Sequence, residues 1–293
     1  MAKVRGVALV TGASTGIGRA TALALSGRGF EVFAGVRKEA DGEAVEDAAA
    51  GDLTSLIIDV TKPASIARAE ATVSRMAGAR GLAALVNNAG IAVAGPLELL
   101  PLDDFRHSLE VNLTGHLAVT QAMLPLLREA RGRIVNITSI GGRIAYPFAG
   151  PYHASKWGLE AVSDSLRGEL QPWGIDVIVI EPGSIATDIW TRGLDQAAET
   201  RKKLGAEGKR LYGPALDALE QTMRDADEAG IPAERVAKTI AKALTATRPK
   251  TRYLIGRDAR GALTAKRLLS DRRFDKLVTR LTKIPGRDSA VKD

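Results

Sequence analysis

Tyr152 and Lys156 are the residues of this chain whose type and spacing point most directly to chemistry. They stand four apart at the start of "YHASKWGLEAVSDSLRGEL" (152–170), a stretch with the apolar pattern of an amphipathic helix. Residues four apart project from one face of a helix, so the phenol and the ammonium can converge on one bound molecule. A free phenol titrates near ~10, and a nearby ammonium lowers that pKa by favouring the phenolate. The pair is therefore either an acid/base site or an ordinary surface pair.

A second candidate site is the glycine-rich stretch "TGASTGIG" (11–18), which joins an apolar run to an Ala-rich helical pattern. Gly12, Gly16 and Gly18 would let the backbone approach a pyrophosphate, whose charge is stabilised by the free N–H groups and positive dipole of a helix start. The spacing is not G-x-G-x-x-G, and no Lys-Ser/Thr pair follows, so a phosphate-transfer loop is not expected. The turn indicates nucleotide binding.

The elements that must position these residues are short β-branched runs that alternate with longer helical patterns. We expect seven strands buried on both faces, at 6–10, 31–36, 55–60, 84–90, 132–140, 175–183 and 251–256. We expect helices at 16–28, 64–77, 103–129, 151–171 and 233–247. This alternation predicts a doubly wound parallel sheet with helices on both faces, a Rossmann fold. Ligands bind such sheets beyond the carboxyl ends of the strands, where the chemical residues stand.

Length and composition indicate the class of protein. The 293 residues are 45% hydrophobic and 26% charged, and no linker-like run divides them, so we expect one domain over 1–293. Cys is absent, which excludes disulfides, thiolate metal sites and a Cys nucleophile and agrees with a cytoplasmic location. No run reaches the ~18 apolar residues of a membrane span, so we expect a protein that is neither exported nor membrane-spanning.

The net charge of +7 is concentrated at the C-terminal end of the chain. From Arg248 onward, fourteen Lys/Arg stand against five Asp, and we expect a basic helical extension over 257–293. Such charge can attract an anionic membrane surface or an acidic partner, or it can be solvated on a terminal helix. The segment lacks interleaved aromatic residues that stack on bases, so no nucleic-acid binding is expected.

Taken in order, the motifs of the chain resemble those of the short-chain dehydrogenase/reductase family. They are TGxxxGIG at 11–18, Asp59 in "IIDVT", "NNAG" at 87–90, Asn112 in "EVNLTG", Ser139 in "NITSIGG", "YHASK" at 152–156 and "EPGSIAT" at 181–187. Within the family, "RGLAALVNNAG", "ARGRIVNITSIGGR", "SDSLRGEL" and the C-terminal extension look most like the branch of retinol and hydroxysteroid dehydrogenases.

The resemblance implies hydride transfer between nicotinamide and a carbinol or carbonyl carbon, with four catalytic residues. Tyr152 would exchange the proton on the substrate oxygen, and Ser139 would donate a hydrogen bond to the same oxygen. Lys156 would favour the phenolate and hold the ribose hydroxyls. Asn112 would link Lys156 to solvent through a water.

Neighbouring residues that could compete for these roles are less suitable. Tyr146 is followed four positions later by Gly150 and so lacks the ammonium, and Thr138 does not hold the family's serine position. The histidines 107, 116 and 153 form no spaced set with carboxylates, so no catalytic metal is expected. We expect His153 to point away from the face that carries Tyr152, because adjacent helical residues do not share a face.

The resemblance also implies a set of residues that bind the cofactor. These are Gly12, Ser14, Thr15, Gly16, Ile17, Gly18, Arg37, Asp59, Val60, Asn87, Ala89, Gly90, Tyr152, Lys156, Pro182, Gly183, Ile185 and Thr187. The NNAG residues would line the adenosine ribose and the middle of the cofactor, while Asp59 and Val60 would meet the adenine. The residues from Pro182 to Thr187 would shape the nicotinamide pocket.

The choice of cofactor depends on the end of the second expected strand, "FAGVRKEAD". Val36 stands where NAD-using relatives often carry an Asp that would repel a 2′-phosphate, and Arg37 can pair with that phosphate. We therefore expect NADP. NAD is the alternative, because the resembled branch includes NAD users without this Asp and Arg37 can simply be solvated.

The stretch 188–231 is expected to be a lid over the substrate, since long segments at the carboxyl edge of such sheets commonly close over ligands. Its apolar residues are Trp190, Leu194, Leu204, Leu211, Tyr212, Leu216 and Leu219. They suit a small lipophilic substrate such as a steroid, a retinoid or another hydrophobic secondary alcohol or ketone. Alternatively, they pack the helices of this stretch onto the body.

Two other functions remain open at this point. The chain could reduce 3-oxoacyl groups on a carrier protein, which the basic extension would dock, or it could be a non-catalytic nucleotide sensor. Helices 103–129 and 151–171 pair across a two-fold axis in resembling proteins, so we expect a dimer or tetramer.

Overall fold

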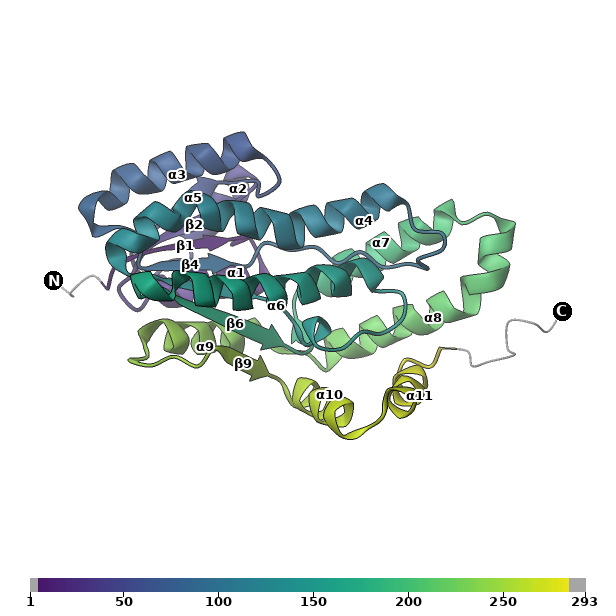
Figure 1. Ribbon diagram of the computed structural model, residues 1–293. Helices are drawn as coiled ribbons and strands as arrows, with labels where there is room; N and C mark the ends of the chain where they lie inside the picture. The colour runs from purple at the N-terminus through teal and green to yellow at the C-terminus, as the bar shows by residue number, and fades with distance from the viewer. Residues whose placement is uncertain (1–4, 285–293) are drawn as a thin grey trace.

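The computed structural model describes residues 5–284, with Lys203 described by its backbone alone, and its centre is a parallel sheet of seven strands (Figure 1). The strand order is β3-β2-β1-β4-β5-β6-β9. The strands are β1 (Val7–Thr11), β2 (Glu31–Val36), β3 (Leu53–Ile57), β4 (Ala84–Asn87), β5 (Arg133–Ile137), β6 (Asp176–Pro182) and β9 (Arg252–Ile255). Every neighbouring pair is parallel, and this confirms the predicted doubly wound fold.

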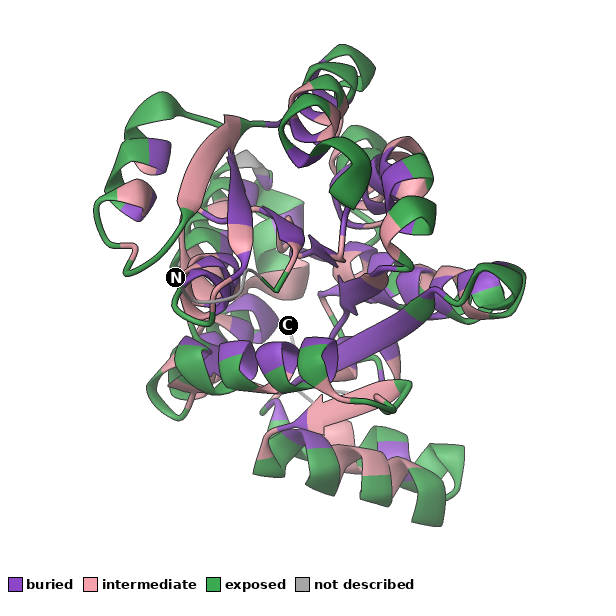
Figure 2. Ribbon diagram, turned by 90° about the vertical axis from the view of Figure 1, so that its left-hand side faces the viewer, coloured by how far each residue is buried: buried purple, intermediate pink, exposed green. Residues whose placement is uncertain are grey.

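Helices cover the two faces of this sheet and enclose two hydrophobic cores. One face carries α1 (Gly16–Ser26), α2 (Glu39–Glu46) and α9 (Ala233–Thr245), and the other carries α3 (Pro63–Ala77), α5 (Gly115–Ala130) and α6 (Gly150–Leu170). Each helix turns a buried side to the sheet and an exposed side to solvent (Figure 2). Because strand residues alternate between the faces, Val10 lies in the first core and Leu9 in the second.

The structure departs from the expected elements in three places. The edge strands β3 and β9 are mostly half-buried, because an edge has a neighbour on one side only, so burial on both faces holds for the inner strands. The helix expected at 103–129 is divided into α4 (Leu102–Leu109), a π-helical turn η2 (Glu110–Thr114) and α5. Helix α2 was not expected, and neither was the small parallel pair β7 (Ile185–Ala186) and β8 (Ile231–Pro232).

Two helical additions lie beyond the central sheet (Figure 1). Helices α7 (Ile189–Lys203) and α8 (Ala206–Glu228) form a hairpin between β7 and β8, within the stretch 188–231. Helices α10 (Arg257–Leu268) and α11 (Asp271–Leu281) follow β9 and make up the described part of the expected extension, whose residues 285–293 lie outside the described range. Short 3-10 turns occur at η1 (Gly78–Arg80), η3 (Ile140–Gly142) and η4 (Gln171–Trp173). None of the described helices has the length and apolar character needed to cross a membrane.

Candidate active site

Ser139, Tyr152 and Lys156 converge where β5 ends and α6 begins. Lys156 is buried, and its Nζ donates to the Ile137 carbonyl at 2.9 Å and lies 5.8 Å from the centre of the Tyr152 ring. Ser139 has an extended backbone at the start of η3, where its Oγ accepts a hydrogen bond from the Gly141 amide at 3.0 Å. Ser139 lies close enough to Tyr152 to favour the phenolate, and this brings the three predicted side chains into one site.

The protonation of the two titrating groups follows from their burial. Burial raises the pKa of the Tyr152 phenol, and the nearby Ser139 side chain opposes that rise. Burial lowers the pKa of Lys156 to about 8, although the negative charge of Glu160, one helical turn away, acts to raise it. The expected lowering of the phenol pKa by Lys156 is therefore not found in the protein alone, since the ammonium is directed to the Ile137 carbonyl.

Asn112 lies on the π-helical turn η2, which widens the helix beside the site. Its Oδ1 accepts from the Ile91 amide at 2.8 Å, and its Nδ2 donates to the Ile91 carbonyl at 2.9 Å and to Ser155 Oγ at 3.0 Å. A Cβ on Gly90 would lie 3.4 Å from Asn112 Oδ1 and 3.9 Å from Lys156 Nζ. The glycine therefore faces both side chains and keeps the space between them open. Single π turns occur often at functional sites, and this one aims the amide inward.

The glycine turn after β1 has the shape that a pyrophosphate requires. Gly12 and Gly16 have φ values of 64° and 53°, which favour glycine, and a Cβ on Gly18 would lie 2.1 Å from the Gly12 carbonyl oxygen. Thr15 is the N-cap of α1 but makes no capping bond with its side chain. The first amides of α1 are thus free to bind an anion, together with the positive end of the helix dipole. This turn fits a dinucleotide.

The NNAG segment faces the same turn through Asn88 and Ala89, whereas the side chain of Asn87 turns into the interior. Asn87 is fully buried, and its Nδ2 donates to Thr120 and Asn136, both at 2.9 Å, so its side chain points into the protein instead of toward a ribose. Asn88 holds the glycine turn by donating to the carbonyls of Thr11 and Gly12, both at 3.0 Å. Ala89 lies against Gly12, where a Cβ on the glycine would approach the Ala89 Cα to 2.7 Å.

The predicted adenine-side residues lie at the ends of β2 and β3. Val36 is buried and Arg37 is exposed, so no carboxylate stands at this end of β2. The Asp59 carboxylate accepts two hydrogen bonds from Thr61 and lies 3.4 Å from the Lys62 ammonium. Burial alone would raise the pKa of Asp59, but these contacts outweigh it and lower the pKa. Val60, beside Asp59, is buried.

The segment after β6 is held against the glycine turn and against the C-terminal extension. Gly183 donates to the Ile255 carbonyl at 2.7 Å, and Thr187 Cγ2 would lie 3.0 Å from a Cβ on Gly16. Ser184 donates from its backbone to Asp258 Oδ2 at 2.7 Å. A Cβ on Gly183 would lie 2.4 Å from both Asp258 oxygens, so a larger residue here would displace the Asp258 carboxylate. Sequence reasoning missed Asp258, because its partner stands 74 residues earlier in the chain.

Comparison with known proteins agrees with this geometry. Residues 6–217 match the sequence model of the short chain dehydrogenase family. The chain belongs to the short-chain dehydrogenase family. This membership confirms the family predicted from the motifs and the class of enzyme, a short-chain dehydrogenase/reductase.

Three similar proteins refine the placement of this short-chain dehydrogenase. NADPH-dependent 3-dehydrocapnine reductase of Ornithobacterium rhinotracheale is 34% identical, with 92% of this chain and 95% of the relative covered. Mouse retinol dehydrogenase 5 is 40% identical, with coverages of 86% and 80%, and places the chain near the predicted branch. The crystal structure of a Burkholderia cenocepacia short-chain dehydrogenase in complex with NADP is 27% identical, has a TM-score of 0.69, and covers 95% of this chain and 98% of that one.

Tyr146 and His153 lie next to Tyr152 in this dehydrogenase. The Tyr146 amide donates to His153 Nε2 at 3.2 Å, and His153 Nδ1 lies 2.8 Å from the Gly141 carbonyl, so the ring carries its proton on Nδ1. His153 thus binds the loop that follows Ser139, and its ring also meets the Tyr152 ring edge-on, with 5.9 Å between the ring centres. Burial and the neighbouring Tyr152 raise the pKa of Tyr146, which keeps that phenol neutral.

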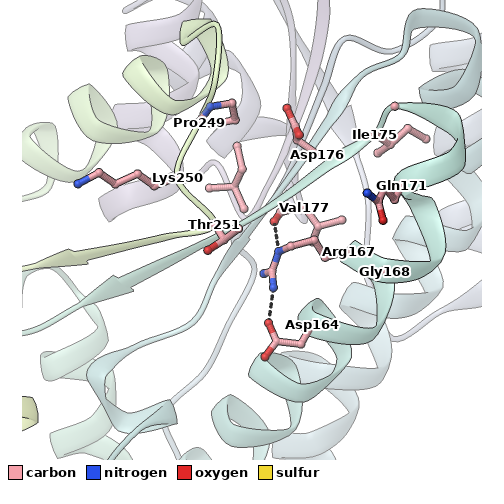
Figure 3. Close-up of a pocket in the computed structure, with 12 residues that line it drawn as sticks. Asp164, Arg167, Gly168, Gln171, Ile175, Asp176, Val177, Pro249, Lys250 and Thr251 are labelled. Carbon is pink, nitrogen blue, oxygen red and sulfur yellow. Dashed lines mark hydrogen bonds and ion pairs between the residues drawn. The ribbon is translucent and has the colours of Figure 1, made fainter.

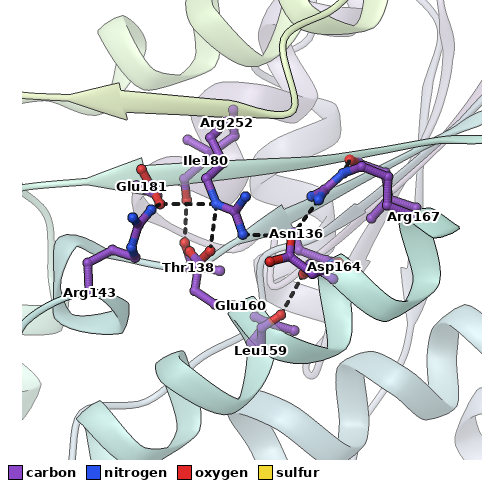
Figure 4. A network of polar contacts seen from close by, with 12 residues as sticks. Asn136, Thr138, Arg143, Leu159, Glu160, Asp164, Arg167, Ile180, Glu181 and Arg252 are labelled. Carbon is purple, nitrogen blue, oxygen red and sulfur yellow. Dashed lines mark hydrogen bonds and ion pairs between the residues drawn. The ribbon is translucent and has the colours of Figure 1, made fainter.

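A buried network of charges backs the site of the dehydrogenase (Figure 4). Arg143, four residues after Ser139, pairs with Glu181 at 2.7 Å. Arg252 of β9 pairs with Glu160 of α6 at 3.0 Å and reaches Glu181 at 3.5 Å. The two carboxylates are 6% and 2% exposed, so the network links the loop of Ser139, the helix of Lys156 and the end of β6 in a region of low solvation.

The hollow drawn in Figure 3 is separate from the site. It has a volume of about 500 Å³ and lies at the amino ends of β6 and β9, lined by Asp176, Val177 and Thr251. Tyr152 and Ser139 lie toward the carboxyl ends of the strands, so this hollow does not hold the substrate. Between residues 5 and 284, no cluster of His, Asp and Glu is arranged to hold a metal ion.

Proposed function

We propose that the protein is an NADP-dependent dehydrogenase/reductase that interconverts a lipophilic ketone and its secondary alcohol. The observation that carries this proposal is the convergence of Ser139, Tyr152 and Lys156 at the same edge of the sheet as the free amides of α1. The nicotinamide, when bound, supplies or accepts the hydride. The described residues supply the remaining steps of the reaction.

During reduction, negative charge develops on the substrate oxygen, and Tyr152 donates a proton to it. Ser139 donates a hydrogen bond to the same oxygen, which stabilises the charge in a site with little water. A phenol whose pKa is raised stays protonated at neutral pH and can act as the acid. During oxidation the phenolate is needed, and the Lys156 ammonium would favour it.

Binding of the cofactor is assigned to the residues that meet at the glycine turn. Gly12, Gly16 and Gly18 admit the pyrophosphate, the segment from Pro182 to Thr187 lies at the nicotinamide side, and Lys156 holds the ribose hydroxyls. The preference for NADP is supported by Val36 and Arg37, and by a relative named as NADPH-dependent and a similar structure that holds NADP. The other predicted cofactor residues, among them Ser14, Ile17 and Val60, stay predictions.

The α7–α8 hairpin is proposed as the substrate lid, within one domain that spans the chain. Leu204, Leu216 and Leu219 are buried in a cluster that also contains Ala94. These three residues therefore pack the hairpin onto the body, which was the alternative to a role in substrate binding. Trp190, Leu194, Tyr212 and Phe148 are only partly buried at the rim of this cluster. They offer an apolar surface for the substrate. Retinol dehydrogenase 5 among the relatives supports a substrate of this lipophilic kind.

The test is a panel of lipophilic ketones and secondary alcohols, assayed with NADPH or NADP and with NADH or NAD. We expect nicotinamide absorbance to change with at least one substrate pair, more rapidly with the phosphorylated cofactor. Binding of NADPH without turnover of any member, including 3-oxoacyl groups on a carrier protein, would favour the nucleotide sensor. Self-association through α4, α5 and α6, a cytoplasmic location and the role of the basic extension stay predictions.

A further inference from the structure

Arg192, in the first turns of α7, reaches across to the glycine turn of β1 and α1. Its Nη2 lies 3.3 Å from Thr15 Oγ1, although the two residues are 177 positions apart in the chain. Thr187, just before α7, lies against Gly16 with its methyl group. The start of the lid hairpin therefore sits directly on the turn that is proposed to hold the pyrophosphate.

The contact between Arg192 and the start of α1 brings two positive groups together, with little negative charge from the protein to offset them. The start of α1 is the positive end of a helix dipole, and no acidic residue stands in its first turn. Cations are stabilised at the carboxyl ends of helices, so a guanidinium at this end is unfavourable unless an anion is shared. Within residues 5–284, Arg192 pairs with the Asp188 carboxylate, 3.7 Å away on α7 itself, and both side chains are more than half exposed. Solvent weakens such a pair.

We propose that Arg192 binds the pyrophosphate of the dinucleotide and thereby couples closure of the α7–α8 hairpin to cofactor binding. A pyrophosphate bound by the free amides of α1 would bring negative charge close to Thr15, whose Oγ1 the Arg192 guanidinium already contacts. Arg recognises phosphate with two parallel hydrogen bonds, which fixes geometry as well as charge. The anion then joins the phosphate turn to the lid and supplies the negative charge that this contact lacks.

This inference rests on the proposed dinucleotide site. It can be tested separately, because Arg192 and Arg37 would contact different parts of the cofactor. Arg37 would meet the 2′-phosphate, which only NADP carries, whereas Arg192 would meet the pyrophosphate, which NADP and NAD share. Loss of Arg192 should therefore weaken both cofactors by the same factor. Loss of Arg37 should weaken NADP alone, which makes Arg37→Ala a matched control within the same chain.

The experiment measures the Kd of NADPH and NADH by nicotinamide fluorescence for the wild type, Arg192→Ala, Arg192→Lys and Arg37→Ala. We expect Arg192→Ala to raise both Kd values about tenfold, the scale of one charge-assisted hydrogen bond, and to leave their ratio unchanged. Arg192→Lys should recover part of the loss, because it restores the charge without the paired geometry. Arg192 is exposed, and circular dichroism will confirm that the variants are folded.

The coupling to the lid is read by limited proteolysis of the α7–α8 hairpin. We expect NADPH to slow cleavage there in the wild type, and to slow it much less in Arg192→Ala at a concentration that saturates both proteins. Unchanged Kd values in Arg192→Ala, a loss confined to NADPH, or equal protection of both proteins would overturn the inference. A wild type that binds neither dinucleotide would instead overturn the proposed function.

Discussion

Arg252 provides a direct test of the buried charge network behind the active site. Replacing it with Met keeps the volume of the side-chain stem but removes the cation that faces Glu160 and Glu181. Both carboxylates are nearly inaccessible to water, and the charge of Glu181 already contributes to the raised pKa of Glu160, behind the larger effect of burial. We therefore expect Arg252→Met to lower the free energy of unfolding substantially.

The size of the loss in unfolding free energy follows from how deeply Arg252 and its carboxylate partners are buried. Removing one partner of a buried ion pair typically costs about 3–5 kcal/mol, because the other charge is left unpaired. The Arg252 side chain is 28% exposed, and Arg143 still pairs with Glu181, so we take the lower end of that range. In a chain of 293 residues, an unfolding entropy of ~2.1 cal/mol/K per residue means that a loss of about 3 kcal/mol lowers the Tm by roughly 5 °C.

The loss should also depend on pH, in a direction set by Glu160. The pKa of Glu160 is raised in the folded protein, and removal of Arg252 raises it further. A carboxyl group with a raised pKa in the folded state destabilises the fold above its unfolded pKa of ~4.3, where only the unfolded chain has lost the proton. The deficit of the variant should therefore be small near pH 4.5 and grow toward pH 8.

The assay is urea unfolding of the wild type and Arg252→Met at several pH values across this range. Arg248→Met is the matched control, because Arg248 is exposed in the loop before the same strand. The reasoning fails if Arg252→Met is as stable as the control at pH 8, or if its deficit is the same at both ends of the range.

Two further predictions concern Lys156 and the cofactor pocket. Lys156→Met should raise the free energy of unfolding at pH 7 on the order of 2 kcal/mol, since burial holds the pKa of Lys156 to about 8. That gain should shrink between pH 8 and ~10.4, where only the unfolded chain keeps the ammonium. Urea unfolding at several pH values tests this, and a variant less stable than the wild type at pH 7 would refute the prediction. Arg37→Ala should remove most of a roughly ten- to hundredfold preference for NADP in kcat/KM, and Val36→Asp should reverse it; a wild type that prefers NAD would refute this assignment.

Much of the fold is predictable from the sequence because its signals are local. The strands are short β-branched runs that alternate with helical patterns of apolar residues, so seven strands in a parallel sheet could be inferred, though not their order in the sheet. The same reasoning wrongly predicted that β3 and β9 are buried on both faces, since nothing in a run such as "TRYLIG" indicates a strand at the edge of the sheet. The helix at 103–129 was expected to be continuous because the π turn around Asn112 does not change the apolar pattern enough to be noticed.

The candidate site divides in the same way. Ser139, Tyr152 and Lys156 could be found because they stand in motifs, and the structure brings them together. Asn87 was assigned to the cofactor because of its motif, whereas its side chain is satisfied by Thr120 and Asn136 in the interior. The contacts of Asp258 and Arg192 join segments far apart in the chain, and no local pattern predicts such pairs. The pKa of Tyr152 likewise depends on burial, which spacing alone does not reveal.

The most direct test of the central claim is a comparison of Tyr152→Phe with Tyr146→Phe, using a substrate found in the panel. Tyr146 is the matched control, because it is a second tyrosine of the same site whose ring packs on His153 and whose phenol is assigned no proton transfer. We expect Tyr152→Phe to keep the Kd for NADPH within a few-fold of the wild type and to lose ~10²–10⁴-fold in kcat, the usual contribution of a general acid or base. We expect Tyr146→Phe to retain most turnover. Near-wild-type kcat in Tyr152→Phe, or a large loss confined to Tyr146→Phe, would contradict the account.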